Sequence, residues 1–157
     1  MNTTLITRPL ELLGRALDSL RSPLLLATRW YVSWQFLKSG WLKVSSWQTT
    51  LGLFREEYRV PLLPPDVAAV AGTCGELFFP VLLVLGLGGR IGPLGLSAVN
   101  LMAVVSYAHV LLAEGFEAAL GQHLLWGFML ITITVFGNGA LALDRLLARP
   151  LGATRRW

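Results

Sequence analysis

The sequence contains few of the residues that a soluble redox or metal enzyme uses. Its 157 residues include one cysteine, two histidines and only 14% charged residues, whereas soluble domains carry about 25% charged residues. Cys74 alone cannot form an intrachain disulfide or a dithiol pair, and no cysteine or histidine spacing predicts a zinc site. We therefore expect no metal and no intrinsic cofactor, and the chain is not a self-contained dithiol oxidoreductase.

Apolar residues dominate what is there. They make up 54% of the chain, and the mean hydropathy is +0.60. One core of this size could not hide that much apolar surface from water, but a lipid bilayer would cover it. The net charge is +4, and the basic residues flank the apolar runs, where they set topology and contact lipid headgroups. These features predict membrane lipid as a partner and no nucleic acid.

Four segments are apolar over the roughly 20 residues that a membrane-spanning helix needs. They are residues 23–44, 66–87, 91–112 and 122–143. No internal repeat is evident and the later connections are short, so we predict an all-α membrane protein built as an antiparallel four-helix bundle. Residues 1–22 place leucines at helical spacing and predict a short amphipathic helix on the membrane surface, with a frayed tail as the alternative. Residues 144–157 are predicted to be a basic cytoplasmic tail.

The distribution of basic residues predicts the orientation. With four spans, both termini lie on one side. Eight basic residues fall on that side: Arg8, Arg15, Arg21, Arg90, Arg145, Arg149, Arg155 and Arg156. Four fall on the other: Lys38, Lys43, Arg55 and Arg59. We therefore expect a bacterial inner-membrane protein with both termini in the cytoplasm.

Four polar residues lie inside the predicted spans, where polar groups are costly and mark function by default. They are Arg29, Gln35, Glu76 and Asn100. Two interpretations stay open for Arg29 and Glu76: a buried ion pair that fixes helix register, or a functional site that anchors the head of a polar ligand or carries a proton. Pro80, one turn beyond Glu76, is expected to kink its helix and open a pocket there.

Three further polar residues are predicted toward the outer face, namely Lys38, His109 and His123. The two histidines close the third span and open the fourth, so they could approach each other. Two ligands without a third are weak evidence for metal or haem. Each histidine is better explained as an interfacial residue bonded to a headgroup or a backbone carbonyl.

Several motifs resemble those of the DoxX family of small bacterial four-helix membrane proteins. The matching stretches are Arg29 to Tyr31, Phe36 to Lys43, Trp47 to Pro65, Gly72 to Leu77, Leu85 to Leu87 and Gly137 to Asp144. The last stretch lacks the proline and serine of the family pattern. The resemblance implies a redox-linked membrane subunit, because family members are associated with thiosulfate:quinone oxidoreduction and with a membrane oxidoreductase complex in thiol homeostasis.

Three functions follow from these observations. The first is an accessory subunit that binds quinone or a soluble or membrane oxidoreductase, with Arg29, Gln35, Glu76 and Asn100 holding the headgroup. The second is a non-enzymatic scaffold in which these residues only lock the bundle. The third is a small transporter, for which four spans are few unless the chain forms a homo-oligomer. The sequence leaves catalytic activity and oligomeric state open.

Overall fold

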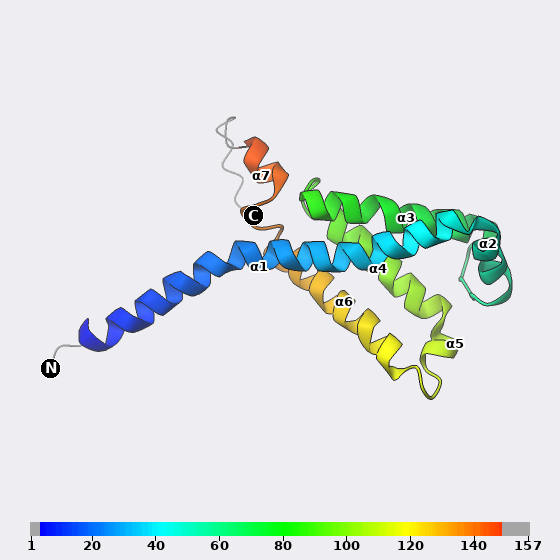
Figure 1. The fold of residues 1–157 in the computed structure, drawn as a ribbon, viewed down its shortest axis with the longest axis horizontal. Coiled ribbons are helices and arrows are strands. Elements are labelled where there is room, and N and C mark those ends of the chain that lie inside the picture. The colour runs from blue at the N-terminus through cyan, green and yellow to red at the C-terminus, as the bar shows by residue number, and fades with distance from the viewer. Residues whose placement is uncertain (1–3, 149–157) are drawn as a thin grey trace.

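The computed structural model describes residues 4–148, and within this range the chain is helical without a strand (Figure 1). The helices are α1 (Thr4–Ser45), α2 (Trp47–Glu56), α3 (Pro65–Leu85), α4 (Ile91–Ser106), α5 (Ala108–Leu111), α6 (Glu117–Phe136) and α7 (Leu143–Ala148). The all-α prediction is confirmed. Most of the predicted basic tail, residues 149–157, lies outside the described residues.

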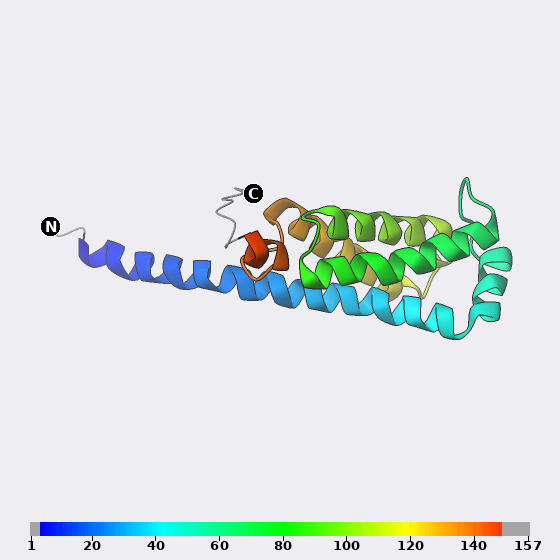
Figure 2. The same cartoon turned by 90° about the horizontal axis from the view of Figure 1, so that it is seen from above.

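The first helix is longer than predicted. A separate amphipathic helix was expected before a span starting at residue 23, but α1 runs unbroken through 42 residues and includes both Pro9 and Pro23. Proline weakens a helix by removing one hydrogen bond, but neither proline ends α1. In both views the N-terminal half of α1 extends away from the other helices (Figures 1 and 2).

The other half of α1 packs against α3, α3 packs against α4, and α4 packs against α6. Successive long helices run in opposite directions (Figure 1). Leu25, Val32, Leu83, Leu96 and Leu130 are buried in the core between them. Contacts between α1 and α6 are sparser than those between α1 and α3, between α3 and α4, or between α4 and α6.

The last two long helices differ in extent from the predicted segments. The third helix breaks at Tyr107 into α4 and α5, and α6 starts at Glu117 and ends at Phe136 rather than covering 122–143. The early end has a local cause, because Gly137 and Gly139 both have a φ of 79°. That left-handed conformation suits glycine and stops an α-helix.

Helix α3 has clear signals at both ends. Pro65 occupies its first turn, where the missing amide costs nothing. Gly86 ends it in the left-handed region, and the amide of Leu87 donates to the carbonyl of Leu82 at 2.9 Å. This 6→1 bond is the mark of a Schellman cap. The C-terminal carbonyls of α3 are therefore fixed in position.

Helix α2 and the segment after it fold over the start of α3. Phe54 is buried against Ala68 and Ala69, and Tyr58 and Val60 pack on the same small cluster. Tyr58, Val60 and Leu63 thereby border the space between α1, α3 and α4.

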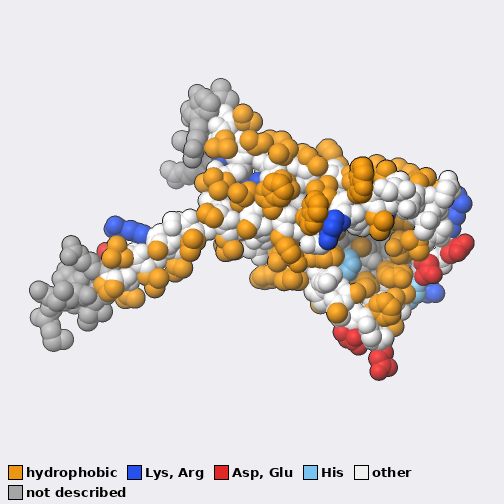
Figure 3. Space-filling model, in the orientation of Figure 1, with side chains coloured by type: hydrophobic (Ala, Val, Ile, Leu, Met, Phe, Trp, Pro, Cys, Tyr) orange, Lys and Arg blue, Asp and Glu red, His pale blue; other side chains and the backbone are white. Residues whose placement is uncertain are grey.

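The outside of the bundle is strongly apolar (Figure 3). On α6, the residues Leu124, Phe128, Ile131 and Val135 form a row at helical spacing, and each is more than 60% exposed. Helices α3 and α6 are long and apolar enough to cross a membrane, and α4 is an apolar but shorter helix. Such rows indicate an integral membrane protein, since water would not tolerate so large a continuous apolar surface.

Candidate functional site: a cavity beside a buried ion pair

The central polar contact joins α1 to α3. The ammonium of Lys43 donates to both carboxylate oxygens of Glu76 at 2.6 Å, and to the hydroxyl of Ser39 at 2.9 Å. The two charged side chains are largely buried, with 18% and 9% of their surfaces exposed. A charge-assisted pair of this kind is strong because little water competes for it.

The expected ion pair between Arg29 and Glu76 is wrong. Antiparallel packing brings Gly40 of α1 level with Glu76, and a β-carbon at Gly40 would lie 2.9 Å from the side chain of Leu77. This close approach places Lys43, one turn further on, at the carboxylate. The sequence placed Lys43 at the outer end of the first span and Glu76 near the middle of the second. The two residues nevertheless lie at the same level, because the N-terminus of α3 extends beyond the C-terminus of α1.

Arg29 is instead buried at the opposite end of α3. Its guanidinium donates to the carbonyls of Leu83 at 2.8 Å and Asn138 at 2.7 Å, and also to the carbonyl of Val84. A cation at the C-terminus of a helix is favourable because the last carbonyls are unsatisfied and partly negative. Arg29 therefore joins α1, the end of α3 and the segment after α6.

A cavity of about 400 Å³ lies beside the ion pair. Its polar lining comes from Ser39, Lys43, Tyr58, Glu76, Ser106, Tyr107 and His123. The rest of the wall is apolar and includes Phe79, Val99 and Met102. The volume falls within the range of about 300–1,000 Å³ that is usual for small-molecule sites. The expected pocket near Glu76 is thus present, and Phe79 rather than Pro80 lines it.

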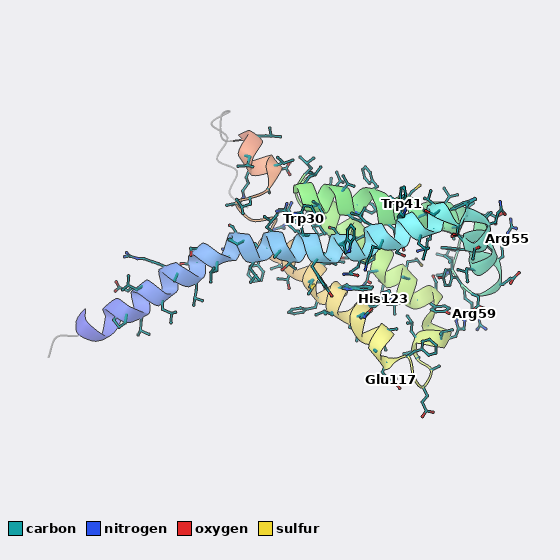
Figure 4. All side chains as sticks on the ribbon, viewed as in Figure 1. Trp30, Trp41, Arg55, Arg59, Glu117 and His123 are labelled. Atoms are coloured by element: carbon teal, nitrogen blue, oxygen red, sulfur yellow. The ribbon has the colours of Figure 1, made fainter. Side chains whose placement is uncertain are left out.

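The molecular surface is hollowed between α1 and α6, where a histidine side chain is visible (Figure 3). Figure 4 identifies it as His123, which projects from α6 into the space that α1 borders. Because His123 also lines the cavity, the cavity is open toward this side of the bundle.

His123 is held by Asn100 of α4. Its Nδ1 lies 2.8 Å from the Asn100 amide oxygen, and the Asn100 amide nitrogen donates to the His123 carbonyl at 3.0 Å. An amide oxygen only accepts, so Nδ1 carries the proton and Nε2 is left as the acceptor. The indole of Trp126 packs edge-on against the imidazole at 5.0 Å. Asn100 therefore orients His123 and does not itself line the cavity.

Two tyrosines were not among the predicted site residues. The ring of Tyr58 contacts the ring of Tyr107 at a centroid distance of 5.1 Å, and both line the cavity. Burial, and next the neighbouring Tyr107, raise the pKa of the Tyr58 hydroxyl above its ordinary value. The phenol stays protonated and can donate a hydrogen bond. Its position depends on the fold of residues 57–63, which no local pattern predicts. Ser106 adds a buried hydroxyl without a hydrogen-bond partner.

The remaining predicted residues lie apart from this set. Gln35 is half-buried on α1 and does not line the cavity, and Lys38 is exposed on the same helix. His109 is exposed and packs against the ring of Tyr107 at 5.6 Å. Among residues 4–148, no group of three or more histidine, cysteine or acidic side chains is placed to hold a metal ion.

An apolar helical bundle with a polar cavity is the class that these features define. The DoxX family model matches residues 24–109, more than half of the chain, and the protein therefore belongs to the DoxX family. A protein of Haemophilus influenzae, described as uncharacterized, is 25% identical over 138 residues, which cover 85% of this chain and 88% of that protein. No solved structure matches.

Proposed function

We propose that this protein spans the bacterial cytoplasmic membrane four times and binds the head of a quinone in the cavity beside Lys43 and Glu76. In this proposal it is an accessory subunit of a membrane oxidoreductase. The observation that carries the proposal is a largely buried ion pair in the wall of a cavity whose lining is mostly apolar. A pair that served packing alone would have no need of an adjoining space of ligand size.

The proposed spans are the C-terminal half of α1, then α3, α4 together with α5, and finally α6. Support comes from the exposed apolar rows on these helices, which lipid would cover. The excess of basic residues near the termini favours a cytoplasmic location for both ends.

The chemistry of the lining suits a quinone head. Quinone carbonyls accept hydrogen bonds, and the Lys43 ammonium and the protonated Tyr58 hydroxyl are donors on the cavity wall. Phe79 and Met102 provide apolar contacts for a ring and the start of a tail. The hollow between α1 and α6 would admit such a ligand directly from lipid. This set keeps Glu76 from the sequence prediction and replaces Arg29, Gln35 and Asn100.

An accessory role follows from the composition. The single cysteine provides no dithiol pair, so a bound quinone would need a partner oxidoreductase to supply or remove electrons. The protein would contribute the ligand site and the place in the membrane, and the partner would contribute the redox centre.

Lipid extraction and mass spectrometry of the purified protein test this proposal. Wild type is compared with Lys43→Met and Glu76→Gln, which remove the cavity pair. The matched control is Arg55→Gln, which breaks the exposed ion pair between Arg55 and Asp66. The closest atoms of this pair are 2.7 Å apart, and neither residue lines the cavity. We expect quinone in wild type and in the control, and its loss from both cavity variants while they remain folded.

A scaffold is the second candidate, and the short contacts of Lys43 with both oxygens of Glu76 favour it. In that role the pair only fixes α1 against α3. Absence of quinone from wild-type protein, with reduced stability in both cavity variants, would support the scaffold and contradict the redox proposal.

A further inference from the structure

The free half of α1 carries a row of leucines that no residue between 9 and 148 covers. Leu10, Leu13, Leu17, Leu20 and Leu24 are 55–67% exposed. The row begins on the part of α1 that extends away from the bundle (Figures 1 and 2) and ends where α1 meets it, because Ser22 accepts a hydrogen bond from Ala140 and Leu25 is buried in the core. Exposed leucines are common singly, but five on one stripe indicate a binding face.

The spacing within this row identifies the kind of partner. The five leucines alternate by three and four residues, which is the a/d pattern of a coiled coil. Glu11, Arg15 and Asp18 lie away from the row and keep the other side polar.

The direction of α1 argues against a position on the membrane surface. A surface helix lies in the membrane plane, whereas the free half of α1 continues from the proposed span through a visible bend (Figure 1) and leads away from the bundle (Figures 1 and 2). At 1.5 Å per residue, the 42 residues of α1 are about 63 Å long. The hydrocarbon core of a bilayer is about 30 Å thick. About half of α1 therefore projects into water.

We propose that two copies of this chain pair through the row Leu10–Leu24 as a parallel coiled coil. This inference rests on the proposed crossing of the membrane by α1, since copies inserted in the same orientation present parallel helices. The positions beside the row permit close approach, because Gly14 and Ala16 are small. In the parallel register Ala16 faces Arg21 of the other copy, so no like charges oppose each other.

The pairing ends where α1 joins the bundle. The same spacing continues through Ala27, Tyr31 and Trp34 to Lys38, all exposed. If two copies stayed in contact as far as Lys38, their two Lys38 ammonium groups would lie together and repel each other. Proline is a common cause of bends in helices, and Pro23 lies at the end of the leucine row. A bend there lets the two helices separate before the membrane.

Single-cysteine cross-linking in native membranes tests the proposal. Cys74→Ser removes the single cysteine, and Leu17→Cys or Leu20→Cys then places one thiol on the row. Leu12→Cys is the matched control, because Leu12 is equally exposed at 63% but lies off the row. After mild oxidation we expect a covalent dimer at both row positions and at most a few per cent as much at Leu12→Cys.

Equal cross-linking at all three positions, or none at any, would overturn the pairing. Light scattering of the purified protein in detergent gives a second measurement. We expect a dimer for wild type and for Leu12→Asp, and a monomer for the double variant Leu13→Asp/Leu20→Asp. A dimer that persists in the double variant also contradicts the proposal. The extraction of quinone does not depend on this row of leucines. Failure of the pairing proposal and failure of the quinone proposal can therefore be told apart.

Discussion

Lys43 and Glu76 connect the end of α1 to the middle of α3 through contacts of 2.6 Å to both carboxylate oxygens. Removing one partner would leave the other as an uncompensated, largely buried charge. We expect Lys43→Met and Glu76→Gln each to lower the free energy of unfolding by about 2 kcal/mol or more. The double variant should lose less than the sum of the single losses.

Unfolding titrations in mixed detergent micelles would measure this double-mutant cycle, with the exposed Arg55–Asp66 pair as the comparison. An exposed pair contributes little, so the coupling there should be much smaller. Additive losses for Lys43 and Glu76 would show that the two residues do not stabilise one another.

Arg29 is expected to be a structural residue and not part of the ligand site. Arg29→Met would remove the guanidinium donor from three carbonyl groups at the junction of α1, α3 and the segment after α6. Of these, the carbonyl of Leu83 keeps the amide of Gly86 at 3.2 Å. The expected loss in the free energy of unfolding is about 3 kcal/mol. Arg21→Met on the same helix is the control, because Arg21 is exposed. In Arg29→Met protein that stays folded, ligand content should match wild type, and loss of ligand would place Arg29 in the site after all.

Asn100 should determine the protonation pattern of His123. The amide oxygen accepts from Nδ1 at 2.8 Å, and the amide nitrogen donates to the His123 carbonyl. Exchanging the oxygen and nitrogen of the Asn100 amide would break the hydrogen bond to the His123 carbonyl. We expect nitrogen NMR of labelled histidine to show the Nδ1–H tautomer in wild type and a mixture in Asn100→Leu. His109, which is exposed, serves as the internal control. A spectrum of His123 that is unchanged in Asn100→Leu would contradict this arrangement.

The sequence predicted the helical class because long apolar segments admit few other structures. It also singled out Glu76 and Arg29 as buried. It could not pair them correctly, since their partners depend on how far α3 is offset from α1. Tyr58 and Tyr107 escaped prediction for a related reason: residues 57–63 and the break at Tyr107 are set by tertiary packing. The unbroken α1 was missed because the change from an amphipathic to an apolar pattern near residue 23 suggested two separate helices.

Small residues set the distance between α3 and α4, which leads to a prediction at Gly92. A β-carbon there would lie 3.0 Å from the backbone nitrogen of Leu83 and 3.2 Å from its α-carbon. Backbone atoms cannot turn aside, so Gly92→Ala should force the helices apart and cost about 1–3 kcal/mol of stability. Gly121→Ala is the matched control, because nothing lies within 4 Å of its added carbon. That change should raise stability by up to about 1 kcal/mol.

Gly95 offers the complementary test of the cavity itself. An added carbon would lie 2.3 Å from the ring of Phe79, and that ring lines the cavity. In Gly95→Ala the ring must move within or across the cavity. We therefore expect the bound ligand to be reduced more strongly than stability when extraction and thermal unfolding are measured on the same preparation. Gly121→Ala should change neither ligand content nor the cavity. Full ligand content in Gly95→Ala would mean that the ligand does not occupy the space beside Phe79.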